Sequence, residues 1–299
     1  MSEISIGDLL PQTTLASLDI SGAVAHLTLR RDDVFNALNP ELIDDITELL
    51  EWTSHRSVAE RGSLTDDSGT PYLRVVVLAG AGRHFSSGHD LKALVGDVEA
   101  DEWRQMRDTP EGKFEHEKVM YFDRCLRIRD FPKPTIAAVN GSCVAAGLML
   151  ACMCDLIVAA DDAVFSNPVL RMTGAAVEIL VEPWEMPPRK AKEFLLAAEK
   201  FTADEAERLG MVNRVVPAER LLAEAHELAE RVAKVPPATA QVVKRSINKT
   251  LDLMGQRDAW DYHFMAHHWM HNTATALDAL EARKAKGSMS EVFAEHREE

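Results

Sequence analysis

Continuously apolar runs of strand length constrain the fold of this chain more than any other feature. They include "LRVVVLAG" (Leu73–Gly80), "TIAAVNG" (Thr135–Gly141) and a third run within "CDLIVAADDAVFSNP". A strand without polar alternation is typical of a sheet that is covered on both faces. An alternating strand, Ala23–Arg30, precedes them, and Asn39-Pro40 opens a helix as N-cap and first helical residue. Strands that alternate with helices predict an α/β core.

The C-terminal part is helical instead. Leu221–Val235 forms one predicted helix, and Ala238–Leu280 is helical again with an interruption at Gly255. We therefore predict two parts, an α/β core over residues 1–215 and a helical region over residues 216–299. Within the core, the stretch 191–209 is predicted as two short helices, and "MVNRVVP" as a short strand after them.

Composition excludes several classes of function. The net charge of −15 disfavours nucleic-acid binding, which needs clustered Lys and Arg. No apolar run reaches the roughly 20 residues that span a bilayer, and the N-terminal segment lacks the pattern of a signal peptide. The four cysteines form no disulfide framework, and the Cys152-x-Cys154 pair has no second pair or nearby histidine to complete a metal site. We expect a cytoplasmic protein with reduced thiols and no metal.

Two segments repeat one design, in which a buried strand leads through a glycine-bearing turn into a helix. They are "VVVLAGAGRHFSSGHDLKAL" and "IAAVNGSCVAAGLMLACMCD". Small residues at 86–88 and 145–147 let a ligand approach the main chain, and N–H groups at a helix start are unpaired. Two such turns facing each other would offer two donors to one thioester or enolate oxygen. The alternative is that small residues merely permit tight packing of helix on strand.

The order of four segments resembles the crotonase superfamily, also called the enoyl-CoA hydratase/isomerase family. They are "FNALNPEL", "LRVVVLAGAGRHFSSGHDLKAL", "PKPTIAAVNGSCVAAGLMLACMCDLIVAADDAVFSNP" and "ADEAERLGMVNRVVPAERL", within about residues 20–250. The resemblance implies a spiral core of ββα turns and a C-terminal helical trimerisation region. It also implies a homotrimer or homohexamer that acts on acyl-CoA thioesters without metal or redox cofactor.

Mapped onto this sequence, the resemblance makes the N–H groups of His89 and Ala146 the oxyanion donors. Around them, the positions expected to bind substrate or coenzyme A are Arg30, Ser87, Gly88, Asp90, Lys92, Gly147, Met149 and Val169. Among these, Lys92 and Arg30, or else Arg31, are candidates for contact with the phosphates. These are weaker candidates, and the preferred alternative is that each cation is an ordinary surface charge.

This sequence departs from the family at the two glutamates of its hydratases. The position two residues after Gly147 is Met149, and the position after Pro168 is Val169. A thioether and an isopropyl group supply no acid or base, and such groups are worth roughly 10²–10⁴-fold each in rate. The usual addition of water is therefore unavailable in its usual form.

Glu178 is the leading substitute acid, because it lies near the position where some isomerase-type members place theirs. In this apolar stretch we expect a raised pKa for its carboxyl; the alternative is a surface or ion-paired glutamate. Glu182 and Glu185 are weaker candidates at the mouth of the pocket. His116 and Tyr121, or the side chain of His89, are weaker still as proton-transfer groups.

Histidines 263, 267 and 271 recur every fourth residue in "YHFMAHHWMHN". Such spacing can chelate a metal, but no carboxylate stands among them, so an interface or a cap over the acyl site is the preferred interpretation.

Three functions stay open. The first is an acyl-CoA enzyme with isomerase-like chemistry, since one carboxyl can move a proton between two carbons. The second is a true hydratase with a different acid pair. The third is a catalytically weak acyl-CoA-binding or regulatory protein.

Overall fold

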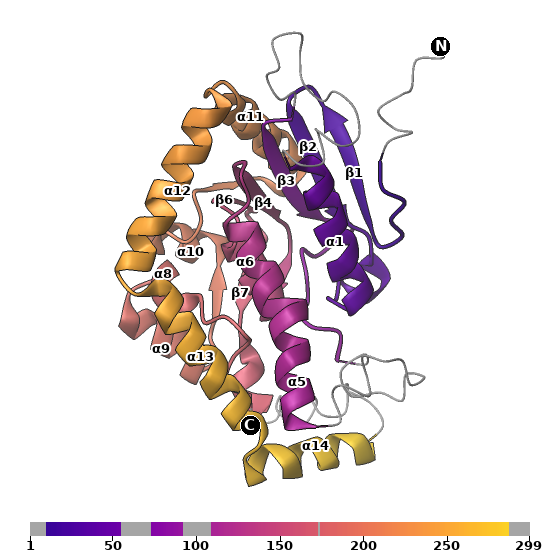
Figure 1. Cartoon of the computed structure of the whole chain (residues 1–299), viewed down its shortest axis with the longest axis vertical. Helices are drawn as coiled ribbons and strands as arrows, with labels where there is room; N and C mark the ends of the chain where they lie inside the picture. The colour runs from indigo at the N-terminus through magenta and orange to yellow at the C-terminus, as the bar shows by residue number, and fades with distance from the viewer. Residues whose placement is uncertain (1–9, 55–72, 92–108, 173, 287–299) are drawn as a thin grey trace.

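The computed structural model describes residues 10–54, 73–91, 109–172 and 174–286 (Figure 1). Its main sheet has six strands in the order β1-β2-β3-β4-β6-β9, and only the β1–β2 pair is antiparallel. The strands are β1 (Ala16–Ser21), β2 (Val24–Leu29), β3 (Val75–Gly80), β4 (Thr135–Val139), β6 (Leu156–Ala160) and β9 (Arg214–Val216). The α/β core that the apolar runs predict is confirmed.

A second, three-stranded sheet stands beside the first. It consists of β5 (Ser142–Val144), β7 (Val164–Ser166) and β8 (Lys200–Thr202). The run "CDLIVAADDAVFSNP" is thus two strands in two sheets. The prediction of two helices over 191–209 omitted β8, which lies between α9 (Pro188–Leu196) and α10 (Ala203–Leu209).

Alternate side chains of β3 enter two different cores. Val76 and Leu78 join the larger core, whereas Val75, Val77 and Ala79 join a smaller one. The smaller core is closed by α11 (Leu221–Ala233), whose buried residues Leu221, Ala225, Ala229 and Ala233 recur every fourth position. Burial on both faces explains why the strand is apolar throughout.

The helix predicted at Asn39-Pro40 is confirmed. In α1 (Pro40–Thr53), the Asn39 side chain accepts a hydrogen bond from the Leu42 N–H, as an N-cap should. The others are α5 (Pro110–Glu117), α6 (Asp123–Arg129), α7 (Ala146–Cys152), α8 (Glu182–Glu185), α12 (Pro237–Leu253), α13 (Gln256–His271) and α14 (Ala274–Lys286). A π-helical turn, 118–122, joins α5 to α6. Gly255, at φ +97°, separates α12 from α13 as expected.

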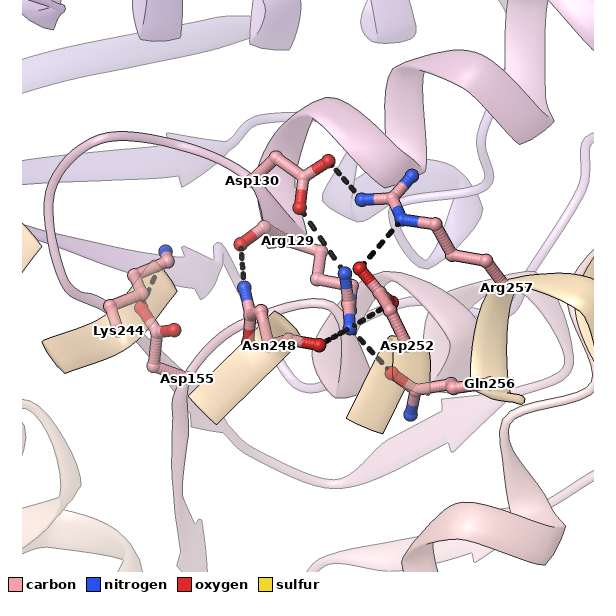
Figure 2. Close-up of polar contacts among 8 residues, drawn as sticks. All are labelled: Arg129, Asp130, Asp155, Lys244, Asn248, Asp252, Gln256 and Arg257. Atoms are coloured by element: carbon pink, nitrogen blue, oxygen red, sulfur yellow. Dashed lines mark hydrogen bonds and ion pairs between the residues drawn. The ribbon is translucent and has the colours of Figure 1, made fainter. Parts of the chain in front are cut away.

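A polar network fastens α12 and α13 to the core (Figure 2). The buried Arg129 guanidinium, at the end of α6, donates to the Asn248 carbonyl oxygen (3.0 Å), to Asp252 (2.8 Å) and to Gln256 (2.6 Å). Lys244 pairs with Asp155 at 2.7 Å. This network fixes the course of α13, which runs alongside α5 (Figure 1).

Among the described helices, none combines the length and hydropathy needed to cross a bilayer. All four cysteines are free thiols at buried or half-buried positions. The division of the chain near residue 215 stays a prediction.

Candidate active site

The two glycine-bearing turns lie side by side. The Ser86 N–H donates to the Ser142 carbonyl oxygen at 3.2 Å, and the Val144 N–H donates to the Ser86 carbonyl oxygen at 3.0 Å. One turn follows β3 and the other carries β5 into α7, so the main sheet and the second sheet together place them.

Glycines allow this contact. Gly88 has φ +88°, and a Cβ there would lie 2.8 Å from the Val144 carbonyl oxygen and 3.3 Å from the Ala146 nitrogen. A Cβ on Gly147 would lie 2.7 Å from the Ser86 carbonyl oxygen. Both distances to oxygen are shorter than a real Cβ contact, so neither position accepts a side chain without movement of a turn.

Most backbone N–H groups around the contact between the two turns donate hydrogen bonds within the protein. The Asp90 N–H donates to the Leu38 carbonyl oxygen (3.0 Å), and the Ala145 N–H to that of Ser166 (2.9 Å). Among the described residues, the N–H groups of His89 and Ala146 have no acceptor. Ala146 begins α7, where an N–H has no partner within the helix, and Ala145 before it is held at φ +49°.

The side chain of His89 belongs to a pair of titratable groups with Glu178. Glu178 is 2 % exposed, and its Oε2 is 2.9 Å from Nε2 of His89. Burial alone would raise the carboxyl pKa, but the charge and hydrogen bond of His89 outweigh it, so the pKa of Glu178 is lowered. The expectation of a raised pKa was therefore wrong: the sequence does not show the partner histidine.

An aromatic side chain packs against the His89 ring. The ring of Tyr121 lies 4.3 Å from it, centroid to centroid, and the ring of the buried His116 lies 6.1 Å from that of Tyr121. Nδ1 of His89 is buried and has no hydrogen-bond partner among the described residues. The structure thus brings together four residues that the sequence nominated, namely His89, His116, Tyr121 and Glu178.

Comparison with known proteins assigns this arrangement to a family. The family model described as enoyl-CoA hydratase/isomerase matches residues 19–289. The chain belongs to the enoyl-CoA hydratase/isomerase family. It is an enzyme of that family, with the crotonase fold.

Several relatives of this family member are substantially similar. A putative enoyl-CoA hydratase of Mycobacterium tuberculosis, EchA13, is 38% identical, over 81% of this chain and 83% of the relative. The (E)-benzylidenesuccinyl-CoA hydratase of Thauera aromatica is 32% identical, over 77% and 80%. The crystal structure of a probable enoyl-CoA hydratase from Mycobacterium smegmatis is 38% identical, with a TM-score of 0.77 over 89% of this chain and 97% of that one.

The residues that replace the two family glutamates differ in burial. Met149 is fully buried in α7, one turn after Ala146, whereas Val169 is half-buried after Pro168. Neither can hold or release a proton. An acid or base at this site would therefore have to come from another position.

Glu182 and Glu185, expected at the mouth of the pocket, lie on α8. Glu182 is 1 % exposed and accepts a hydrogen bond from the Asn167 side chain at 2.7 Å, and its burial raises its pKa. Burial and the neighbouring Glu182 raise the pKa of Glu185 to about 7. No described contact joins either residue to His89.

The candidate coenzyme A contacts are spread out. Arg30 is exposed and donates to Ser17 on β1 at 3.3 Å. Arg31 instead pairs with Asp90 at 2.9 Å, right beside the first turn. Ser87 is half-buried, and its N–H donates to the Phe35 carbonyl oxygen. Lys92 lies outside the described residues.

One charged residue near the site was missed from the sequence. Glu117, the last residue of α5, is 4 % exposed and faces histidines of α13, including His267 at 3.3 Å. The carboxylate that the histidine run lacks in its own segment is therefore supplied by a distant helix. No local signal marks it, because the contact depends on how α5 and α13 pack.

Proposed function

We propose that this enzyme acts on an acyl-CoA thioester and polarises its carbonyl oxygen with the N–H groups of His89 and Ala146. Glu178 then moves a proton between two carbons of the acyl chain, which is isomerase-like chemistry. One observation carries the proposal: two adjoining turns leave these two amides without an acceptor among the described residues, and a buried carboxyl contacts the side chain of His89, which carries one of them.

The two amides suit an oxygen that gains negative charge. Removal of a proton next to the thioester leaves an enolate, and two fixed N–H donors stabilise its oxygen more than that of the ground-state carbonyl. In other enzymes one such donor is worth about 10²–10³-fold in rate. The strained Ala145 and the left-handed Gly88 set both donors in place before substrate arrives.

Glu178 suits the proton transfer. Its lowered pKa keeps it ionised at neutral pH, so it begins the reaction as a base. It takes a proton from C2 of a 3-enoyl thioester, the electrons pass to the thioester oxygen, and the same proton returns at C4. The double bond moves and atoms balance with no cofactor besides the thioester. His89 orients the carboxylate through its Nε2.

Deuterium exchange tests the proposal independently of the final product. The enzyme in D₂O should incorporate deuterium into an acyl-CoA next to the thioester, and should convert a 3-enoyl-CoA to the 2-enoyl isomer. We expect Glu178→Gln to slow both by at least 10²-fold while binding of the thioester persists. Glu230→Gln, on α11 at the other face of the sheet, is the control and should match the wild type.

The other outcomes identify the alternatives. Hydration of crotonyl-CoA that survives Glu178→Gln would favour a hydratase with a different acid pair. Binding without exchange or turnover would favour an acyl-CoA-binding protein, which the apolar Met149 and Val169 suit. Absence of thioester binding by the wild type would contradict the isomerase, the hydratase and the acyl-CoA-binding interpretations alike.

Assembly into a homotrimer or homohexamer is also proposed. Large apolar side chains are exposed on α12 and α13, including Ile247, Leu253, Tyr262 and Trp269. An isolated protomer would leave them in water, and a subunit interface would cover them. Light scattering coupled to gel filtration should give three or six times the mass of one chain; a monomer would contradict this proposal.

A further inference from the structure

A cluster of three histidines and one glutamate lies where α13 crosses α5. His267, His268 and His271 come from α13 and Glu117 from α5. The side chains of Glu117, His267 and His268 are 5–7 % exposed, and that of His271 is 25 % exposed. A site built this way is closed on the protein side and reachable from solvent through His271.

The ligand-type atoms converge. Nε2 of His267 is 3.3 Å from Oε2 of Glu117, and Nε2 of His271 is 3.8 Å from the same oxygen. The two Nε2 atoms are 2.9 Å apart. Bonds of about 2.0–2.1 Å to a tetrahedral Zn²⁺ place ligand atoms roughly 3.3 Å apart, so one ion fits among these three atoms.

We propose that Glu117, His267 and His271 bind a divalent transition-metal ion. Imidazole and carboxylate ligands favour Zn²⁺. Two imidazoles one helical turn apart plus one carboxylate form a three-ligand set, with the remaining position open toward solvent. His268 approaches the same carboxylate oxygen to 3.2 Å from the other side. The sequence alone predicted no metal because Glu117 is remote from the histidine run.

A hydrogen bond behind the site orients the imidazole of His267. Nδ1 of His267 lies 3.4 Å from the Ala175 carbonyl oxygen, which can only accept, so Nδ1 carries the proton and Nε2 is left to coordinate. Lys113 lies 3.8 Å from Oε1 of Glu117, whereas the histidines approach Oε2.

Two polar atoms of the cluster face each other at 3.2 Å. Oε2 of Glu117 and Nε2 of His268 are buried, and neither has a hydrogen-bond partner of good geometry among the described residues. Imidazole nitrogens of His267 and His268 lie 3.3 and 3.2 Å from this oxygen, but without hydrogen-bond geometry they stabilise the buried carboxylate only in part. A bound cation would complete its pairing.

The site is tied to the segment that carries Glu178. The carbonyl oxygens of Ala175 and Val177 face His267 and His263 of α13, at 3.4 and 3.0 Å. A metal that locks α13 onto α5 therefore also steadies residues 175–178. The ion has a structural role here and takes no part in the proton transfer proposed above.

The test is metal binding by tag-free, full-length protein. The protein is stripped with a chelator, dialysed and titrated with ZnCl₂ by calorimetry, and the Co²⁺ form is examined by absorption. We expect one Zn²⁺ per chain with micromolar or tighter affinity, and a Co²⁺ spectrum of four-coordinate type. His271→Ala, chosen because His271 is partly exposed, should weaken binding at least tenfold.

Two further variants guard the interpretation. Glu117→Gln keeps the size of the side chain but removes the charge, so it should also weaken binding if His271→Ala proves poorly folded by circular dichroism. His226→Gln removes a histidine of α11, 3.0 Å from His26, and should bind like the wild type. No uptake by the wild type, or equal uptake by all four proteins, would overturn the proposal.

Discussion

The substitution Gly88→Ala probes the contact between the two turns. Gly88 has φ +88°, and the added methyl carbon would lie 2.8 Å from the Val144 carbonyl oxygen and 3.3 Å from the Ala146 nitrogen. The left-handed conformation costs an alanine about 1–2 kcal/mol. We expect the collision to force the turns apart, so that the N–H groups of His89 and Ala146 can no longer both bind the thioester oxygen.

A matched control separates these two effects. Gly210 has φ +90°, and nothing lies within 4 Å of a Cβ placed there. Gly210→Ala therefore carries the same backbone strain without a collision. Both variants should lose about 1–2 kcal/mol of unfolding free energy to strain, and Gly88→Ala should lose more because of the contact.

The variants Gly88→Ala and Gly210→Ala should differ far more in activity than in stability. We expect deuterium exchange next to the thioester to fall about 10²–10³-fold in Gly88→Ala, the worth of one oxyanion donor, and to stay within about twofold of the wild type in Gly210→Ala. Urea unfolding gives the stability of each variant. Equal exchange rates in the two folded variants would refute the role given to the turn contact.

Other predictions concern stability. Arg129→Met leaves Asp252 and Gln256 without the buried guanidinium, and should lower the free energy of unfolding by about 3–5 kcal/mol in urea titrations; a loss under about 1 kcal/mol would contradict the role given to this network. The pKa of Glu185 is raised from 4.5 to about 7, so the folded protein holds a proton that the unfolded chain has lost, and stability falls as pH rises from about 4.5 to 7. Over that interval Glu185→Gln should reduce the fall by about 1–3 kcal/mol, and an unchanged slope would count against a raised pKa.

Local sequence signals predicted those parts of the fold that local physics decides. Asn39 and Pro40 opened a helix, and Gly255 interrupted one, because caps and backbone preferences act within a few residues. The strand Lys200–Thr202 escaped prediction, since three residues give no periodic pattern and its pairing with β7 depends on the tertiary fold.

The candidate site was predictable to a similar extent. The two glycine-bearing turns are predictable from the sequence, and the resemblance to the family identifies His89 and Ala146 within them as the candidate donors. The direction of the pKa shift of Glu178 was not predictable, because it depends on a contact with His89 across 89 positions. Glu117 was missed for the same reason, since its histidine neighbours belong to a helix near the other end of the chain.

The central claim is that the N–H groups of His89 and Ala146 both bind one thioester oxygen. A crystal structure of the enzyme with a non-reactive acyl-CoA analogue tests it most directly. The account predicts that the thioester oxygen lies about 2.7–3.1 Å from both nitrogens, with the Glu178 carboxylate beside C2 of the acyl chain. A thioester oxygen that faces solvent, or that contacts neither amide, would contradict it.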